Sequence, residues 1–479
     1  MKKLCKTLIW LVLIPLLVLG GALVGITAYI ESCITPESVV ALIEGEKNCR
    51  VEVMSCHVSI LDQPASITLK GVTFTPRDAF ADNATPLANR PKVDPGTTAI
   101  LCPSVVLKVR LWDLLVRKLQ VNELELQEPE VRFSIKPGGG NTLKPILAPL
   151  KKKMDTSGGA DPAPKTPKPK SGSGGSGDSG VPGAPPGKKK FHVSQLPLQS
   201  TLKLAHLNGG TLKMFVEKSG AVIEVKVHDF SFSDINVNPY DLDSGNTATM
   251  HLDCTIAVDD PAENLRYTEL HVGIDGGIIP FEPDTGFLNP DMKYDVVFKK
   301  GTYVQSVPFM EKLGNSVKEL KEIGLKLDEL GQKETLSEDQ QARVGYRDDT
   351  IRLIDPLVLP FDNYQLTLSK YSWIQTAKSE HKFGGNVLIS NELTTKALDE
   401  VERVVRGKIG GDVAAVARKL VDPILTENQI SLDFRSEGSL GKPKLKIDNP
   451  ISSIKDALRE QGKSLLDRTL DIFGGDRDE

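Results

Sequence analysis

The chain has 479 residues, of which 39% are hydrophobic and 25% are charged, so it carries enough apolar side chains to form a core. Its 59 Lys and Arg residues are offset by 63 Asp and Glu residues, which gives a formal net charge of -4. No overall basic field exists to attract a polyanion, and we therefore expect no nucleic-acid partner.

The N-terminus is predicted to cross a membrane once. Residues 1–6 are a short basic start, and residues 7–30 form an uncharged run of about 24 residues that would extend roughly 36 Å as a helix. This length exceeds the ~30 Å hydrocarbon core and is greater than the apolar region of a cleaved signal peptide. The positive-inside rule places residues 1–6 in the cytoplasm and the body of the protein on the other side.

Composition divides the body of the chain into blocks. Two blocks are rich in alternating strands, and a tract of Gly, Pro, Ser and Lys between them cannot pack a core and is predicted to be a disordered linker. The blocks are the first strand-rich domain at 31–150, the linker at 151–190, the second strand-rich block at 191–307, a helical insertion at 308–345, strands with a helix at 346–450, and an amphipathic helix with the tail at 451–479.

Apolar residues recur at helical spacing in three segments, 309–330, 398–420 and 454–470. An amphipathic helix usually buries its apolar stripe on a sheet, and contact with a partner or a membrane is the rarer alternative. A further short helix is expected to start after Thr35, because threonine caps helices and Pro36 suits the first turn.

The strand-rich blocks share a pattern of strand, tight turn and strand. Residues 119–133 turn at Glu128-Pro129, residues 202–214 turn at Gly209-Gly210, and residues 430–447 turn at 441–443. Residues 67–74 around Gly71 resemble half of this pattern. Apolar and polar residues alternate within these segments, which predicts a sheet with one apolar face.

Two architectures are compatible with such strands. A β-sandwich would bury the apolar face against a second sheet, and this is the common outcome for alternating strands. A long sheet curled into a trough would leave the face partly open, where it could hold acyl chains.

The order of segments resembles the AsmA-like proteins of bacteria with two membranes. An N-terminal span is followed by a helix at 35–44 and by strands at 50–60 and 67–75. The most recognisable match is VVLKVRLWDLLVRKLQVNELELQEPEVRF at 105–133, and LKLAHLNGGTLKMFV at 202–216 and LDFRSEGSLGKPKLKIDNP at 432–450 are similar to the middle and closing parts of the family. The linker and the helical insertion have no counterpart in the family.

The resemblance implies a mainly β protein in which an N-terminal transmembrane helix is followed by a long, curved, antiparallel, groove-shaped sheet. It implies an anchor in the inner membrane, a body in the periplasm, and a role in phospholipid transport or outer-membrane assembly. The ligand would be phospholipid or another envelope lipid. The side chains expected to line the groove are Leu69, Val121, Leu124, Leu126, Leu204, Leu212, Met214, Leu432 and Phe434.

Length limits the mechanism that a groove could support. If 16 to 18 strands stacked at ~4.8 Å, the groove would be about 80 Å long, too short to join two membranes alone. The protein would then pass lipid to a periplasmic or membrane protein partner. The alternative is an envelope scaffold that binds protein partners through its helices and carries no lipid.

No motif points to an enzyme or to a cofactor. His251 and Cys254 form a single H-x-x-C without a second pair, and a zinc site needs four ligands. Asp241 and Asp243 resemble the start of a calcium loop, but Leu252 occupies the position of the bidentate glutamate. Neither a nucleophile elbow nor a phosphate loop is present in the sequence, so we expect no catalytic residue, no metal site and no cofactor.

Overall fold

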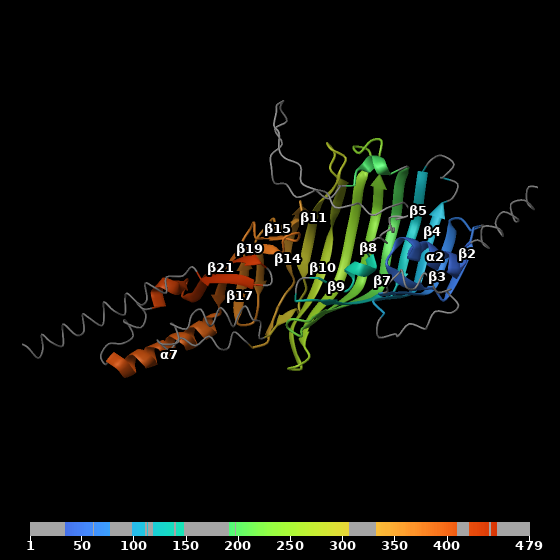
Figure 1. Cartoon of the computed structure of the whole chain (residues 1–479). Coiled ribbons are helices and arrows are strands. Elements are labelled where there is room, and N and C mark those ends of the chain that lie inside the picture. The colour runs from blue at the N-terminus through green and yellow to red at the C-terminus, as the bar shows by residue number, and fades with distance from the viewer. Residues whose placement is uncertain are drawn as a thin grey trace, which may run out of the picture.

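The computed structural model describes residues 34–60, 62–76, 98–110, 113, 118–137, 140–147, 191–196, 198–305, 332–409, 421–439 and 442–447. Within them, 22 strands pair into one large sheet that is mostly antiparallel. Figure 1 shows the sheet running from the blue N-terminal strands, through the long green strands, to the orange and red strands beside α7. The protein is therefore mainly β, as predicted, and the described strands do not stack as the two sheets of a sandwich.

The elements have the following bounds. The helices are α2 (Pro36–Glu46), α4 (Lys144–Leu147), η4 (Val193–Gln195), α7 (Asn391–Ile409) and η6 (Asp422–Ile424). The strands of the N-terminal half are β1 (Cys49–Glu52), β2 (Ser55–Ser59), β3 (Ala65–Pro76), β4 (Ile100–Arg110), β5 (Lys118–Gln127), β6 (Glu130–Ile135), β7 (Gln199–Val216), β8 (Val222–Val237), β9 (Asn246–Asp260), β10 (Leu265–Phe281), β11 (Leu288–Phe298) and β12 (Tyr303–Val304). The strands of the C-terminal half are β13 (Glu334–Thr335), β14 (Gln340–Arg347), β15 (Thr350–Leu353), β16 (Leu357–Pro360), β17 (Tyr364–Leu368), β18 (Trp373–Gln375), β19 (Glu380–Ile389), β20 (Leu425–Thr426), β21 (Gln429–Ser439) and β22 (Lys442–Ile447).

Helix α2 begins where the sequence predicts. Thr35 accepts a hydrogen bond from the Ser38 amide, and the Ser38 side chain bonds back to the Thr35 backbone, which completes a capping box. Val40 is buried against Val51 and Ile146, so α2 and α4 cover the apolar face of the sheet beside β1.

The order of the strands across the sheet follows from their pairings. β1 and β2 both pair with β3, and the sheet continues through β4, the collinear β5 and β6, β7, β8, β9, β10, β11, β14, β15, β18, β19, β21 and β22. β16 and β17 form a branch on the second half of β19.

The strands β5 and β6 are not a hairpin, in contrast to the prediction. Both run parallel to β7, one after the other, with Leu126 paired to Leu207 and Val131 paired to Leu212. Glu128-Pro129 interrupts this combined strand without reversing it. Parallel neighbours begin at the same end of a sheet, so the chain must return along the full length of β7. The connection that does so contains the Gly, Pro, Ser and Lys tract at 151–190, which lies outside the described residues.

The glycine pair in 202–214 also marks an interruption and not a turn. β7 continues through Gly209, whose φ of 69° is left-handed. Gly71 similarly lies inside β3 with a φ of 61°. The predicted strand at 50–60 is divided into β1 and β2, both of which pair with β3. The predicted pair at 430–447 is a true hairpin, because β21 and β22 are antiparallel neighbours.

These interruptions lie side by side across the sheet. At one level of the sheet, the residues without a partner in the strand registers are Gly71 in β3, Pro103 in β4, Glu128 and Pro129 between β5 and β6, Gly209 in β7 and His228 in β8. The line ends at β9, where Cys254 and Asp253 pair with residues on either side of His228. Unpaired residues of this kind bend a strand and increase its twist, so five neighbouring strand positions are bent at the same level.

The C-terminal part of the sheet has a closed core. Val387, Leu432 and Phe434 are buried with Val401 from α7, and the exposed fractions of Leu432 and Val401 are 0%. The predicted helix at 398–420 is therefore present at least over α7, and it packs on the sheet.

Several predictions fall partly or wholly outside the described residues. The apolar stripes at 309–330 and 454–470 do so, and the end of the helical insertion at 345 was placed too late, because β13 and β14 begin before it. Residues 7–30 are also outside. No helix among the residues that the structure describes is long and apolar enough to cross a bilayer.

Candidate functional site: the two faces of the sheet

The strand registers align the apolar side chains on one face of the sheet. Residues that are paired across neighbouring strands point to the same side, so a row of partners can be followed from strand to strand. One row crosses nine strand positions from β3 to β14 through Leu69, Val105, Leu126, Leu207, Phe230, Leu252, Ile274, Val296 and Ala342. Every member is apolar, and we call the side of the sheet that carries this row the apolar face.

Further rows lie on the same face on both sides of the line of unpaired residues. Leu107, Leu124, Ala205, Phe232 and Met250 form a second row. Beyond the line, Ile100, Val131, Leu212, Val225, Ile256 and Leu270 form a third. An unpaired residue shifts the alternation of its strand by one residue. Since neighbouring strands carry this shift at the same level, the apolar side chains stay on one face on both sides of the line.

The middle of the apolar face is half-buried. Cys254, Val272 and Val296 are buried among partly exposed neighbours such as Leu252 and Ile274. Burial also raises the pKa of the Tyr294 hydroxyl to about 12 and raises the pKa of the Cys254 thiol. The surroundings of these groups are therefore weakly solvating although the face is not closed like the C-terminal core.

Eight of the nine predicted groove residues share the apolar face. Those with intermediate exposure are Leu69, Val121, Leu124, Leu126, Leu212 and Met214, whereas Leu432 and Phe434 lie in the closed core under α7. Phe230, Phe232, Leu252, Ile274 and Val296 belong to the same face and were not among the predicted residues. Their alternation within β8 to β11 is visible in the sequence and could have identified them.

Leu204 lies on the opposite face. It pairs with Glu123 and with Ser233, and Glu123 forms an ion pair with Lys108 at 2.5 Å. Asn122 is an additional residue in β5 relative to β4, and Asp234 lies at a register shift of β8 with a left-handed φ of 53°. In a regular strand, Leu202 and Leu204 would lie on the same face. Because of these irregularities, Leu202 pairs with Val121 on the apolar face and Leu204 lies on the opposite face.

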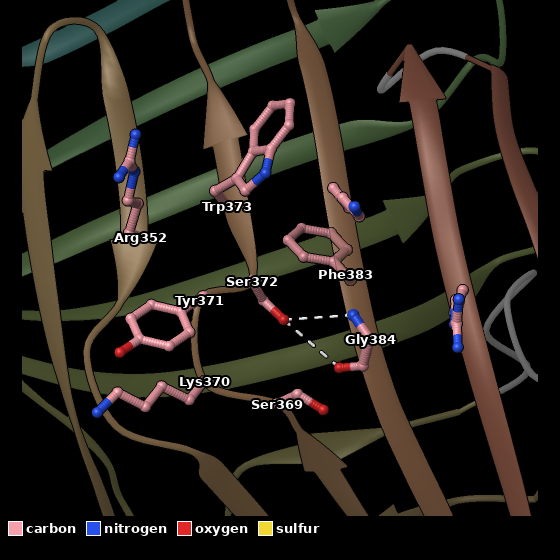
Figure 2. Close-up of a pocket in the computed structure, with 10 residues that line it drawn as sticks. Arg352, Ser369, Lys370, Tyr371, Ser372, Trp373, Phe383 and Gly384 are labelled. Atoms are coloured by element: carbon pink, nitrogen blue, oxygen red, sulfur yellow. Dashed lines mark hydrogen bonds between the residues drawn. The ribbon is translucent and has the colours of Figure 1, made fainter.

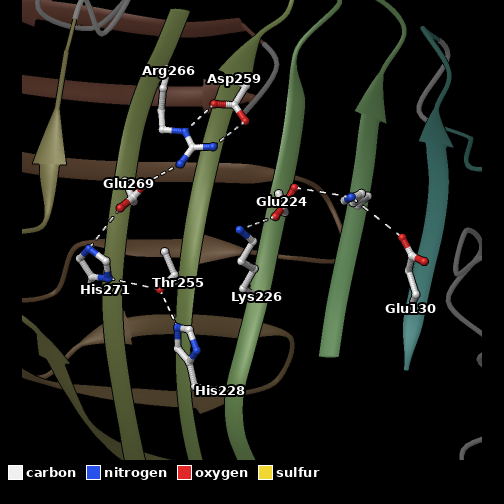
Figure 3. A network of polar contacts seen from close by, with 10 residues as sticks. Glu130, Glu224, Lys226, His228, Thr255, Asp259, Arg266, Glu269 and His271 are labelled. Atoms are coloured by element: carbon white, nitrogen blue, oxygen red, sulfur yellow. Dashed lines mark hydrogen bonds and ion pairs between the residues drawn. The ribbon is translucent and has the colours of Figure 1, made fainter. Parts of the chain in front are cut away.

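The opposite face is polar and its charges are largely paired. Figure 3 shows Glu224 beside Lys226 of β8, whose ammonium is 3.2 Å from the Glu224 carboxylate. Lys213 of β7 lies 3.8 Å from the other oxygen of this carboxylate. Arg266 donates to Asp259 at 2.7 Å and also contacts Glu269, and both carboxylates raise its pKa. Such a face is stable in contact with water, which leaves the apolar face as the unusual surface.

A ladder of histidines and aspartates crosses the polar face beside this network. The His206 Nε2 atom is 2.9 Å from Asp229, and the His251 Nδ1 atom is 2.5 Å from Asp275. The hydrogen bond to Asp275 is the main cause that raises the pKa of His251 above its usual range. Among the described residues, no three His, Cys, Asp or Glu side chains are grouped so that they could hold a metal ion.

Comparison with known proteins gives no family: no family model matches the chain, and no curated protein is significantly similar to it.

Proposed function

We propose that the protein is an inner-membrane-anchored periplasmic protein whose sheet forms a hydrophobic groove, and that it assists phospholipid transport or outer-membrane assembly. The observation that carries this proposal is the unbroken apolar row from Leu69 to Ala342. The resemblance to the AsmA-like proteins supports the same reading, with residues 7–30 as the anchor.

The dimensions of the apolar face suit acyl chains. Nine strand positions at ~4.8 Å spacing extend roughly 38 Å, more than twice the ~15 Å of hydrocarbon in one leaflet. Bent strands favour a curved sheet, because the unpaired residues lie at one level across β3 to β8. Curvature toward the apolar side would turn this face into a groove, and the polar face would remain in water.

The sheet has about 15 successive strand positions, which at ~4.8 Å spacing give roughly 67 Å. This is shorter than the length expected from the sequence, and we infer that the protein passes lipid to a partner. The closed core under α7 ends the exposed apolar face at the C-terminal side. A partner would therefore receive lipid beside α7 or at the level of β14.

Site-specific photo-crosslinking tests the proposal with the full chain in cells of a two-membraned bacterium. A benzophenone amino acid replaces Phe230 on the apolar face, and in the matched control it replaces Ser231, the next residue on the polar face. We expect phospholipid adducts by mass spectrometry at position 230 only. Equal labelling at both positions, or protein adducts without lipid at position 230, would favour the scaffold alternative.

A further inference from the structure

A basic recess lies on the polar face of the C-terminal strands, away from the apolar face. Figure 2 shows it between β15, β18 and β19. Its volume is about 630 Å³, within the range of small-molecule sites. The lining residues are Arg352, Ser369, Lys370, Tyr371, Ser372, Trp373, Lys382, Phe383, Gly384 and Arg435.

The strand register builds the recess. Arg352, Trp373 and Lys382 are partners in one row across β15, β18 and β19, so their side chains point to the same side. Gly384 follows on β19 and pairs with Arg435 on β21. Because Gly384 has no side chain, the row opens into a depression between the two arginines.

The turn that forms one wall is held in place by hydrogen bonds. The buried Ser372 hydroxyl donates to the Gly384 carbonyl at 3.4 Å and accepts from the Gly384 amide at 3.3 Å. The Ser369 amide donates to the same carbonyl at 2.8 Å. Tyr371 adopts a left-handed φ of 68° and is 69% exposed. The turn is therefore held in place before any ligand binds, and the Lys370 ammonium lies 5.0 Å from the centroid of the Tyr371 ring.

The charges of the recess are unlike those on the rest of the polar face. Elsewhere, Lys108, Lys226, Arg266 and Lys299 each form ion pairs with carboxylates. No carboxylate lines the recess, and the ion pairs between described residues include none for Arg352 or Lys382.

Two acidic residues near the recess, Glu437 and Asp355, do not alter this contrast. Glu437 is the cross-strand partner of Lys382 but does not line the recess. Asp355 is engaged by Arg343 at 2.5 Å, although Lys370 also lowers the pKa of Asp355. The recess therefore holds an excess of positive charge in a defined shape.

We propose that this recess binds a phosphorylated sugar. Guanidinium and ammonium groups recognise phosphate oxygens, and arginine does so with two parallel hydrogen bonds. The face of Trp373 supplies a flat apolar surface against which a sugar ring can pack, with the Ser369 hydroxyl at the wall. An acyl chain would not be stable beside Arg352, Lys370 and Lys382, so this site is separate from the proposed lipid groove and does not depend on it.

Calorimetric titration of the full-length protein in nanodiscs tests the inference. The titrants are glucose 6-phosphate, inorganic phosphate and glucose, at low ionic strength and again at higher sodium chloride. We expect saturable binding of glucose 6-phosphate that weakens with salt, weaker binding of inorganic phosphate, and little binding of glucose. Vesicles that contain lipid A, whose headgroup is a phosphorylated disaccharide, distinguish a membrane lipid from a free sugar phosphate as the source of the ligand.

Variants connect binding to the recess. The exposed pair Arg352→Ala with Lys382→Ala is expected to weaken glucose 6-phosphate binding at least about tenfold, because each removes a charge-assisted hydrogen bond. Lys226→Ala, which removes an exposed cation elsewhere on the same face, should leave binding unchanged. Trp373→Leu should remove the preference for glucose 6-phosphate over inorganic phosphate.

Three results would overturn the inference. Absence of saturable binding at low salt would exclude the site, and an equal loss in the Lys226→Ala variant would place binding elsewhere. Equal affinity of the wild-type protein for inorganic phosphate and glucose 6-phosphate would exclude the sugar. Circular dichroism identifies any variant that fails to fold. If one of them does, Gly384→Ala serves as a second variant of the recess. It is expected to fold, because a Cβ at this position would meet only Ser369, at ordinary contact distance.

Discussion

Replacing one leucine on each face of β7 separates a role in lipid binding from a role in stability. Leu207 pairs with Leu126 and Phe230 on the apolar face, and Leu204, three residues earlier, pairs with Glu123 on the polar face. Both side chains have intermediate exposure. Leu207→Asp and Leu204→Asp are therefore matched in strand, residue type and degree of burial, and differ in the face that receives the charge.

The expected magnitudes differ between the two properties. Full burial of a leucine contributes about 1.5–3 kcal/mol, so loss of a half-buried leucine should lower the free energy of unfolding by about 1–2 kcal/mol in either variant. A carboxylate in contact with hydrocarbon costs a further ~2.5–3.5 kcal/mol, which corresponds to roughly a hundredfold loss of bound lipid. Only Leu207→Asp should incur this second cost, because Leu204 does not face the proposed groove.

The assay is native mass spectrometry with lipid extraction on residues 31–479, purified without detergent from a two-membraned bacterium. Stoichiometric phospholipid should accompany the wild-type protein and Leu204→Asp, and should be lost from folded Leu207→Asp. Equal lipid in the two variants would refute the assignment of the apolar face. A folded wild-type protein that is reproducibly free of lipid would refute the groove itself and favour the scaffold.

Three further predictions concern the fold. Gly71→Ala should destabilise the protein by about 1–2 kcal/mol in denaturant unfolding, because the φ of Gly71 is left-handed and a Cβ would lie 2.9 Å from the Cβ of Met54. In the control Gly277→Ala, the added Cβ would have no atom within 4 Å, so stability should change little. Equal effects of the two substitutions would contradict this explanation. Phe434→Ala should cost about 3–5 kcal/mol because the ring is 2% exposed, and a smaller loss would mean that the core under α7 is not closed. Because the pKa of His251 is raised in the folded protein, the stabilising contribution of His251 should be complete below its unfolded pKa of 6.5 and should be lost as the pH rises through its folded pKa. The measurement is the difference in Tm between wild type and His251→Gln as a function of pH. A difference that does not vary with pH would contradict this prediction.

Local patterns in the sequence were sufficient for some features of the fold and the candidate site. The Thr35 cap and the start of α2 depend on neighbouring residues only, and so does the alternation that makes one side of each strand apolar. Eight of the nine predicted groove residues consequently share a face. The hairpin of β21 and β22 was also predictable from its two alternating runs, although Lys442 and Pro443, predicted to lie in the turn, are paired residues of β22.

The same signals were misleading at Gly209-Gly210 and at Glu128-Pro129. Glycine and proline mark both tight turns and interruptions within a strand, and a local pattern cannot distinguish them. The distinction depends on the partner strand: β7 continues because β5 and β6 lie beside it in parallel, after a long return connection. The register, unlike the alternation, is a property of strands far apart in the sequence.

The sequence alone determined that this protein is rich in strands with one apolar side, because the two-residue period of a strand is set by the backbone. Which side each residue joins after an unpaired position depends on the pairing with distant strands, as Leu204 shows. The same pairing aligns the apolar rows into one face, and packing against α7 places Leu432 in a closed core. Pairing and packing between distant segments fix these features, and the order of residues along one strand does not contain them.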